Sequence, residues 1–263
     1  MHVARKRFGQ HFLHDPGIIA RIIAAIDPKP DDPMVEIGPG LGAITLPLLQ
    51  RLKRLDAVEI DRDAIRHLRE ATAGADARRG ELRIHEADAL EFDFGPLHEQ
   101  PMRLVGNLPY NISTPLLFHL IGQRDRIRDM HFMLQKEVVD RMAAGAGDDA
   151  YGRLSVMLAP WLRIEPLFDI GPGAFRPPPR VMSTVVRLLP HESPPFAVAD
   201  PDRFARIVAA AFSQRRKTLR NSLRSLLDEE QIRAAGVDPG ARAEVIAPAQ
   251  FAALAERPGK NPG

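Results

Sequence analysis

The stretch Val35-Glu36-Ile37-Gly38-Pro39-Gly40-Leu41-Gly42 places three glycines within five residues, directly after a short apolar run. A helix-compatible segment, residues 43–52, follows it. Glycine has no Cβ and adopts backbone conformations that other residues avoid, so a ligand can lie directly against the main chain of such a turn. The pattern predicts a strand, a tight turn and a helix, with a nucleotide-sized pocket at the carboxyl end of a parallel strand.

The spacing of the glycines narrows the class of ligand. It is G-x-G-x-G, not the G-x-G-x-x-G of dinucleotide folds or the G-x-x-x-x-G-K-[ST] of phosphate loops, and no Lys or Arg directly follows to hold phosphates. Glu59 ends the next apolar run, and Asp88 follows the one after that. An acid at the first position typically accepts hydrogen bonds from ribose hydroxyls, and one at the second can accept a bond from an adenine amino group. We therefore expect S-adenosylmethionine as the cofactor; a glycine turn that only packs a helix on a sheet is the alternative.

The composition is that of an ordinary globular protein. The chain has 263 residues, 44% of them hydrophobic and 27% charged, which fits one or two domains. Cysteine is absent, which excludes disulfides and sulfur-ligated metal sites, and the nine histidines show no metal-binding spacing. The N-terminal residues lack the apolar core of a signal peptide, and the apolar run at residues 18–26 is too short to span a membrane. We expect a cytoplasmic protein with no metal site and no membrane association.

Apolar strands and amphipathic helices alternate over the first part of the chain. A helix is expected from Asp15-Pro16 to residue 26. The elements expected after it are strand 34–38, helix 43–52, strand 55–60, helix 62–73, strand 82–87, strand 103–107, helix 114–122, strand 129–135 and helix 136–144. The runs 161–170 and 184–189 are expected to be the last, partly antiparallel strands. This alternation predicts an α/β fold, a Rossmann-like domain whose parallel sheet is covered by helices on both faces.

A change of pattern places a domain boundary near residue 195. Residues 191–195 resemble a linker, and the pattern after them is helical only. We therefore expect an α/β domain over residues 1–195 and a small all-helical domain over residues 196–263. A helix expected over residues 202–214 continues into a basic segment. Helical spacing would place four of its cations on one face: Arg216, Lys217, Arg220 and Arg224.

Two basic clusters are candidate RNA-binding segments, because cations that neutralise phosphates dominate nucleic-acid affinity. The first lies beside the N-terminus and the second in the helical domain. Their members are Arg5, Lys6, Arg7, Arg215, Arg216, Lys217, Arg220 and Arg224. A solvated tail and a solvated helix face are the simpler explanations for these clusters.

The motif Asn107-Leu-Pro-Tyr-Asn111 directly follows the fourth strand. Methyl transfer to the adenine amino group needs geometry more than proton chemistry, because the nitrogen lone pair is delocalised and must be aimed at the methyl group. The Asn107 side chain and the Leu108 carbonyl, held by Pro109, can accept the two N–H bonds. Tyr110 and Phe175 can stack on the two faces of the base. A turn in which Tyr110 only caps the sheet is the alternative.

These motifs resemble those of the small-subunit ribosomal RNA adenine dimethyltransferases, the KsgA/RsmA family, over nearly the whole chain. The segments that carry the resemblance are Lys6-Arg-Phe-Gly-Gln-His-Phe-Leu13, Glu36-Ile-Gly-Pro-Gly-Leu-Gly42, Glu59-Ile-Asp61, Asp88-Ala-Leu90, Asn107-Leu-Pro-Tyr-Asn111, Phe175-x-Pro-x-Pro-x-Val-x-Ser183, Phe212-Ser-Gln-Arg-Arg-Lys-Thr-Leu219 and Asn221-Ser-Leu223. The resemblance implies a class I S-adenosylmethionine-dependent methyltransferase. It implies dimethylation at N6 of two adjacent adenosines in the loop of the 3′-terminal hairpin of 16S rRNA, by a monomer acting on the small ribosomal subunit.

The resemblance also implies roles for individual residues. Cofactor contacts fall on His11, Leu13, Gly38, Gly40, Glu59, Asp88 and Asn107. The target-base site falls on Asn107, Leu108, Pro109, Tyr110 and Phe175. The motif from Phe175 to Ser183 is called the proline-rich loop below. In it, Arg180 and Met182 stand where the family more often has Lys and Asp.

Three other functions share parts of this sequence pattern. A large-subunit rRNA adenine methylase that confers antibiotic resistance shares the fold and a similar Asn-x-Pro-Tyr motif. A DNA adenine methylase is disfavoured, because that class usually carries Asp-Pro-Pro-Tyr and a separate recognition domain. A ribosome-assembly factor whose main role is binding would use the same basic surface.

Overall fold

The computed structural model describes residues 11–73, 80–109 and 111–258. Two compact units divide the chain: an α/β unit of Met1–Val139 and Ile164–Pro190, and a helical unit of Asp140–Arg163 and His191–Gly263. This division differs from the single boundary expected at residue 195. Residues 140–163 belong with the helical unit because Tyr151 and Val156 are buried in its hydrophobic core.

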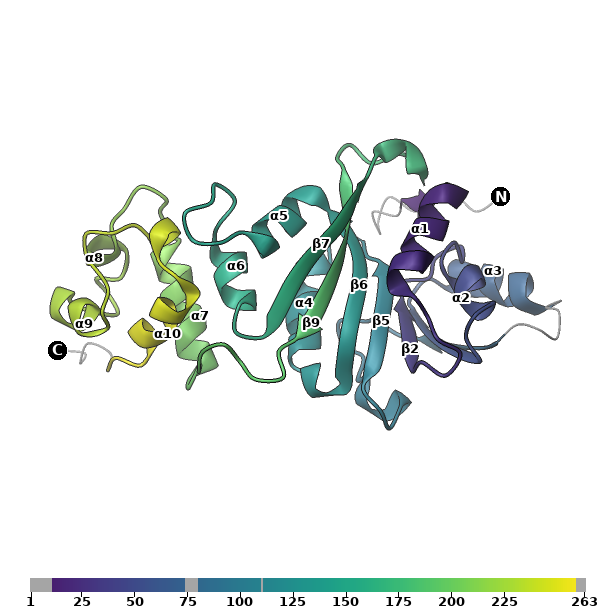
Figure 1. Cartoon of the computed structure of the whole chain (residues 1–263), viewed down its shortest axis with the longest axis horizontal. Helices are drawn as coiled ribbons and strands as arrows, with labels where there is room; N and C mark the ends of the chain where they lie inside the picture. Colours follow the sequence, from purple (N-terminus) through teal and green to yellow (C-terminus); the bar gives the residue numbers. More distant parts are fainter. Residues whose placement is uncertain (1–10, 74–79, 110, 259–263) are drawn as a thin grey trace. The chain divides into compact units, whose positions relative to one another are not determined.

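The α/β unit is built on a seven-stranded sheet with the order β4-β3-β2-β5-β6-β9-β7 (Figure 1). Its strands are β2 (Met34–Ile37), β3 (Arg54–Glu59), β4 (Glu81–Glu86), β5 (Met102–Asn107), β6 (Ile127–Gln135), β7 (Leu162–Ile170) and β9 (Ser183–Pro190). Neighbouring strands from β4 to β6 are parallel, and β9 is antiparallel to β6. The α/β prediction is confirmed, including an antiparallel strand late in the sheet.

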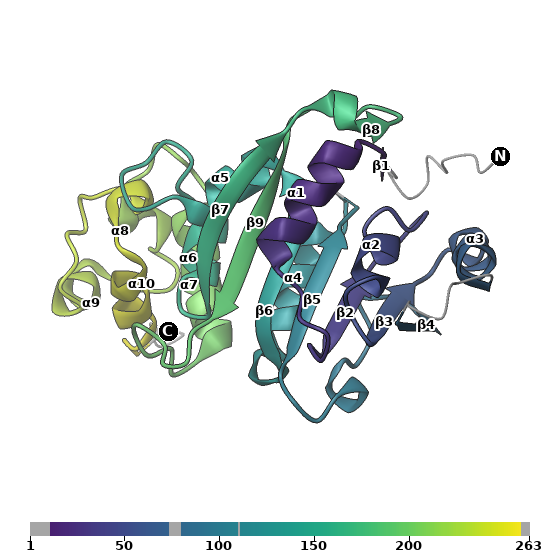
Figure 2. The same cartoon turned by 45° about the vertical axis from the view of Figure 1, so that its right-hand side comes forward.

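Helices cover both faces of this sheet. They are α1 (Pro16–Ile26), α2 (Thr45–Leu49), α3 (Arg62–Ala73), α4 (Ser113–Ile121) and α5 (Lys136–Ala143), with 3-10 turns at Gly95–Leu97 and Arg124–Arg126. Ile23 of α1 and Leu48 of α2 are buried in one core cluster with Val105 and Met133 of the sheet. In two views α1 lies in front of the sheet and α4 behind it (Figure 2).

The first helix begins where the sequence predicts it. The Asp15 carboxylate accepts hydrogen bonds from the N–H groups of Gly17 and Ile18, and Pro16 occupies the first turn. Both features stabilise the start of a helix, because the first N–H groups have no partner within it. The helix ends at Ile26, and the capping residue after it, Asp27, adopts the left-handed conformation with φ of 48°.

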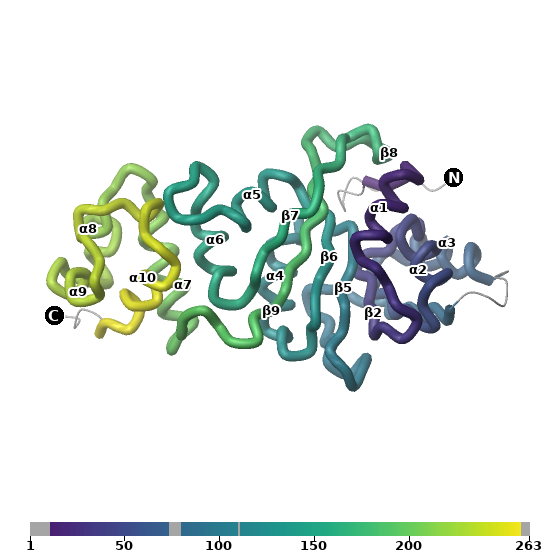
Figure 3. Tube along the Cα trace, viewed as in Figure 1, coloured from purple at the N-terminus to yellow at the C-terminus, as the bar shows by residue number. Residues whose placement is uncertain are grey.

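A small second sheet joins two distant parts of the α/β unit. Strand β1 (Phe12–Leu13) pairs antiparallel with β8 (Phe175–Arg176), which follows the 3-10 turn Pro172–Ala174. The tube in Figure 3 shows the chain running from β7 to β8, near the start of α1. The described residues before α1, residues 11–15, are called the N-terminal segment below. This sheet therefore fixes the proline-rich loop against the residues that precede α1.

The helical unit contains α6 (Arg153–Leu158), α7 (Pro201–Ala211), α8 (Leu219–Ser222), α9 (Glu229–Ala234), α10 (Pro248–Ala255) and the 3-10 turn Ala243–Val245. Its core includes fully buried Phe204 and Phe251. The Asp200 carboxylate caps α7 by accepting from the N–H of Arg203. Among the described residues, no helix is long and apolar enough to cross a membrane.

The expected continuous helix through the basic segment is wrong. Helix α7 ends at Ala211, residues 212–217 form turns, and α8 is a separate short helix. Leu219 and Leu223 are fully buried, and Thr218 forms an isolated β-bridge with Arg242. The chain turns so that these leucines can enter the core, and Leu227 is buried there too. The basic residues 215–217 therefore do not share a helix face with Arg220 and Arg224.

Candidate cofactor and target-base site

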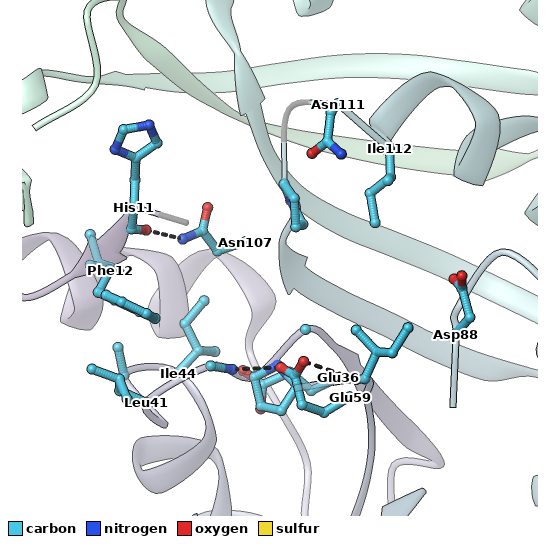
Figure 4. Close-up of a pocket in the computed structure, with 17 residues that line it drawn as sticks. His11, Phe12, Glu36, Leu41, Ile44, Glu59, Asp88, Asn107, Asn111 and Ile112 are labelled. Carbon is cyan, nitrogen blue, oxygen red and sulfur yellow. Dashed lines mark hydrogen bonds between the residues drawn. The ribbon is translucent and has the colours of Figure 1, made fainter. Parts of the chain in front are cut away.

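A pocket of about 340 Å³ lies where β2, β3 and β5 end, between the glycine turn and the N-terminal segment (Figure 4). All seven residues predicted to contact the cofactor line it: His11, Leu13, Gly38, Gly40, Glu59, Asp88 and Asn107. Pro109 of the predicted target-base site lines it as well. The parallel sheet brings these residues together because the carboxyl ends of its strands lie at one edge.

The glycine turn has the backbone conformation that its sequence predicts. Gly38, Gly40 and Gly42 have φ values of +66°, +54° and +85°, which L side chains rarely adopt. A Cβ on Gly38 would meet nothing within 4 Å, so the main chain is exposed to the pocket there. A Cβ on Gly40 would lie 3.4 Å from the ring of Phe12. The main chain of the turn is therefore accessible to a ligand at Gly38, and Phe12 of the N-terminal segment packs closely against it at Gly40.

The Glu59 carboxylate is held rigidly at the end of β3. Its Oε2 accepts a bond from the N–H of Gly40 at 3.2 Å, and its Oε1 accepts bonds from the N–H groups of Ile60 and Asp61 at 2.9 Å each. Burial raises the pKa of Glu59, while the three N–H bonds oppose that shift. Oε2 accepts only one of these bonds, so it keeps a lone pair that can accept from a ribose hydroxyl.

Glu36 is a pocket residue that the sequence reasoning missed. It lies in the middle of β2, is only 2% exposed, and its Oε2 has no hydrogen-bond partner among the described residues. Burial raises the pKa of Glu36 to about 8; the neighbouring Thr45 hydroxyl opposes this shift, and the charge of Glu59 adds to it. A carboxyl group between apolar Val35 and Ile37 was the available signal, because an acid inside a buried strand is costly without a functional or structural role.

Ile60 and Phe12 are two of the other pocket residues that the sequence reasoning missed. Ile60 is 50% exposed, although it is a large apolar side chain beside the buried Glu59. Its exposed face gives the pocket an apolar wall on which a planar base can lie. Asp88, which the sequence predicted, is held by the main chain two residues further on, because its Oδ1 accepts from the N–H of Leu90 at 2.9 Å. Phe12, the second missed residue, lines the pocket from the N-terminal segment.

The amide of Asn107 has a defined orientation. Its Nδ2 donates to the main-chain carbonyl of His11 at 2.9 Å (Figure 4). The opposite atom of the amide, Oδ1, is therefore the acceptor that Asn107 offers to other groups. The next residue is anchored too, because the N–H of Leu108 donates to the carbonyl of Met133 at 3.3 Å and its side chain is buried. An acceptor side chain and a fixed main-chain segment thus lie at the carboxyl end of β5.

Of the two predicted stacking residues, the structure describes only Phe175, and it does not place that ring as expected. Phe175 is only 2% exposed, pairs with Leu13 across the β1·β8 sheet, and does not line the pocket. Its ring belongs to the core beneath the N-terminal segment, so the expected open stacking surface is not present at this position. Tyr110 lies outside the described residues.

The predicted RNA-binding residues fall into three groups. Arg5, Lys6 and Arg7 lie outside the described residues. The side chains of Arg215, Arg216 and Lys217 are all exposed. Arg220 is exposed and forms an ion pair with Glu229 at 3.3 Å. Arg224 is exposed on the segment after α8.

The chemistry of the pocket fits S-adenosylmethionine. Among the described residues that line it there is no Lys or Arg, so it is not built for a phosphorylated ligand. It offers instead a buried acceptor at Glu59, an acid at Asp88, an apolar wall and exposed glycine main chain. Together the doubly covered sheet and this pocket define a class I S-adenosylmethionine-dependent methyltransferase.

Comparison with known proteins assigns the family. The model of the ribosomal RNA adenine dimethylase family matches residues 1–259. The chain is 56% identical over 257 residues to ribosomal RNA small subunit methyltransferase A of Methylococcus capsulatus, covering 97% of this chain and 98% of that one. It is 55% identical over 261 residues to the protein of the same name from Laribacter hongkongensis, covering 99% and 98%. The chain therefore belongs to the ribosomal RNA adenine dimethylase family and is an S-adenosylmethionine-dependent enzyme.

Solved structures agree with this assignment. A dimethyladenosine transferase from Plasmodium falciparum is 27% identical with a TM-score of 0.75, covering 93% of this chain and 96% of that one. The 23S rRNA methyltransferase ErmE is 28% identical with a TM-score of 0.69, covering 93% and 98%. One of these enzymes acts on large-subunit RNA, so the shared fold by itself does not decide between the two ribosomal substrates.

Proposed function

We propose that this enzyme dimethylates N6 of two adjacent adenosines in the loop of the 3′-terminal hairpin of 16S rRNA, within the small ribosomal subunit. The observation that carries the proposal is the Asn107 amide, whose Oδ1 is presented as an acceptor at the edge of the pocket. The choice of ribosomal subunit rests on the relatives that are more than half identical over nearly their whole length and are named for the small subunit. We further propose that the enzyme acts as a cytoplasmic monomer.

The cofactor site is proposed to form around three fixed groups. Oε2 of Glu59 accepts from a ribose hydroxyl, Asp88 accepts from the adenine amino group, and the main chain at Gly38 lies against the methionine portion. His11, Leu13 and Gly40 complete the wall on the side of the N-terminal segment. S-adenosylmethionine, when bound there, supplies the electrophilic methyl group.

The residues of the motif 107–110 are proposed to prepare the amino group of the target adenine. Asn107 Oδ1 and the Leu108 carbonyl accept its two N–H bonds, which draws the nitrogen toward tetrahedral geometry and its lone pair out of conjugation with the ring. Pro109 restricts the main chain that carries this carbonyl. No general base is needed for the bond-forming step, since a positioned amine with a localised lone pair is the nucleophile.

Stacking on the target base is proposed for Tyr110, whereas Phe175 is buried in the core and is no longer proposed to stack. Base–aromatic stacking contributes about 1–3 kcal/mol per base in other systems. A flipped adenine is unstacked from its neighbours, so this contribution offsets part of the cost of flipping.

Methyl incorporation with labelled cofactor tests the proposed substrate. Purified small subunits whose 16S rRNA lacks the modification should accept label, whereas 23S rRNA and a DNA duplex should not. Label on 23S rRNA alone would favour the large-subunit alternative. An Asn107→Ala variant that transfers no methyl group yet fully restores subunit maturation would make binding, as an assembly factor, the principal role.

A further inference from the structure

His11 is attached to the site at two points that lie far apart in the sequence. Its main-chain carbonyl accepts from Asn107 Nδ2 at 2.9 Å. Its imidazole Nδ1 lies 2.8 Å from the main-chain carbonyl oxygen of Pro177. A carbonyl oxygen can only accept, so Nδ1 carries the proton and donates it. One residue thus connects the amide of the target-base site with the proline-rich loop.

The β1·β8 ladder beside His11 is short. Strands β1 and β8 pair only at Phe12 with Arg176 and at Leu13 with Phe175, and the N–H of His14 donates to the Ala174 carbonyl at 3.0 Å. A two-stranded ladder of this length is marginally stable without additional support. The imidazole bond lies at the open end of this ladder and adds a link beyond its last pair.

The N-terminal segment also contacts the cofactor side of the pocket. The ring of Phe12 lies so close to Gly40 that a Cβ there would be 3.4 Å away, and Phe12, Leu13 and His11 all line the pocket. A displacement of residues 11–13 would therefore move the pocket wall, the acceptor that orients Asn107 and the loop at Pro177 at the same time. The segment connects the cofactor side and the base side of the site.

We propose that His11 is a positioning residue: its imidazole pins the N-terminal segment to the Pro177 carbonyl, and its own carbonyl then holds the Asn107 amide with Oδ1 toward the target base. This role is additional to the place of His11 in the wall of the cofactor pocket, and it rests on the proposed function for the identity of the base. The side chain acts through Asn107, so its loss should slow methyl transfer more than it weakens cofactor binding.

Three variants of His11 distinguish the role of its hydrogen-bond donor, Nδ1, from that of the imidazole ring itself. In His11→Asn the amide Nδ2 occupies nearly the position of the imidazole Nδ1 and keeps a donor. In His11→Phe the ring is kept and the donor is lost, and in His11→Ala both are lost. We expect kcat within about three-fold of wild type for His11→Asn and at least ten-fold lower for the other two. The cofactor Kd, measured by calorimetry, should weaken less than kcat falls, because His11 lines the cofactor pocket but acts on transfer through Asn107.

A readout that needs no RNA keeps this inference separate from the proposed substrate. Hydrogen exchange of the cofactor-free protein should show faster exchange at residues 12–14 and 174–177 in His11→Phe and His11→Ala, with wild-type rates in His11→Asn and in the core strands of all variants. This result would stand even if 16S rRNA proved not to be the substrate.

Several outcomes would overturn the inference. A His11→Phe enzyme with wild-type kcat and exchange would remove the imidazole bond from the mechanism. A cofactor Kd that weakens in proportion to the loss of activity would make His11 a cofactor ligand instead. Loss of activity in His11→Asn together with the other two, or global unfolding of all three, would also contradict it, because the retained donor is the feature that should suffice.

Discussion

Two buried carboxylates of the same pocket behave differently because their partners differ. Glu59 accepts three N–H bonds from the main chain, whereas Oε2 of Glu36 has no partner among the described residues. Charged groups in a low-dielectric interior are stabilised mainly by such bonds. Glu59 is therefore suited to accept from a ligand, and Glu36 is held in its neutral form at pH 7 because burial raises its pKa to about 8.

Glu59→Gln tests the cofactor site. The change keeps the size of the side chain, but removes the charge and one acceptor atom. Hydrogen bonds to charged groups contribute roughly 1.5–3 kcal/mol, so the affinity for S-adenosylmethionine should fall about ten-fold or more in a calorimetric titration. Glu86→Gln is the matched control, because Glu86 is the register partner of Glu59 on β4, ion-paired with Arg62, and does not line the pocket. Equal affinities of wild type and Glu59→Gln for S-adenosylmethionine would show that Glu59 does not bind the ribose.

Glu36 makes stability depend on pH in a defined direction. Its pKa is near 4.5 when unfolded and about 8 when folded, so the folded chain binds more protons between these values. Its contribution to the free energy of unfolding is fully present below pH 4.5 and is lost as the pH rises toward 8, by at most about 1.4 kcal/mol per pH unit. Denaturant unfolding of the cofactor-free protein from pH 5 to pH 8 should show this loss in wild type and a shallower one in Glu36→Gln. If the free energy of unfolding changed with pH equally in wild type and Glu36→Gln, the raised pKa of Glu36 would be contradicted.

At the scale of elements, the site depends on how closely β2 and β5 approach. Gly106 directly precedes Asn107 on β5, and a Cβ there would lie only 2.4 Å from the carbonyl oxygen of Ile37. Ile37 is in turn the residue before the glycine turn. The absence of a side chain at Gly106 therefore sets the distance between the turn that faces the cofactor and the amide that faces the base.

Gly106→Ala should separate these two strands. Overpacking of this kind costs about 1–3 kcal/mol, which should appear as a lower free energy of unfolding together with slower methyl transfer. Gly173→Ala is the control, since a Cβ at Gly173 meets nothing within 4 Å and its φ is not in the left-handed region. Its stability should stay within about 0.5 kcal/mol of wild type. A Gly106→Ala protein as stable and active as the control would show that the strands can shift without consequence.

The elements also show which parts of the structure could be predicted from sequence. The sheet, its helices, the glycine turn, Glu59 and Asp88 were predictable, because apolar periodicity, capping at Asp15, closely spaced glycines and acids at strand ends are local signals. His11, Leu13 and Asn107 were assigned to the cofactor site only through the family resemblance. The burial of Phe175 and the pairing of β1 with β8 were not, since they depend on contacts more than 160 residues apart. The basic segment after α7 was predicted as helix because its charges have helical spacing. The need to bury Leu219 and Leu223 in the core overrode that preference.

At the scale of the whole molecule, the exposed cations at residues 215–217 are the described part of the second basic cluster. They form no ion pair with another described residue, unlike Arg220, which pairs with Glu229. Cations that lie on a turn rather than along one helix face can still contact phosphates, since nonspecific affinity depends on charge more than on element type. Residues 215–217 therefore remain a proposed RNA contact, although they form a turn and not a helix. Because they share no helix face with Arg220 and Arg224, these three residues should be tested together.

Replacing Arg215, Arg216 and Lys217 with Ala should weaken binding to small subunits and flatten its dependence on salt. Each phosphate contact contributes a slope of about 0.7–0.9, so the loss of three contacts should reduce the slope by about two to three units. Arg215→Lys with Arg216→Lys is the matched control, because it keeps every charge and should keep the slope. The cofactor Kd should not change in either variant. A triple Ala variant with the wild-type slope would mean that RNA is bound elsewhere.

The proposed reaction has a distinctive product, N6,N6-dimethyladenosine at two neighbouring positions. The most direct measurement is mass spectrometry of the 3′-terminal fragment of 16S rRNA, after undermethylated small subunits have been incubated with the purified enzyme and isotope-labelled S-adenosylmethionine. Two labelled methyl groups should appear on each of two adjacent adenosines of the hairpin loop with wild type, and none with Asn107→Ala. Label at any other adenosine, or an unlabelled hairpin in the presence of cofactor-bound enzyme, would contradict the proposed function.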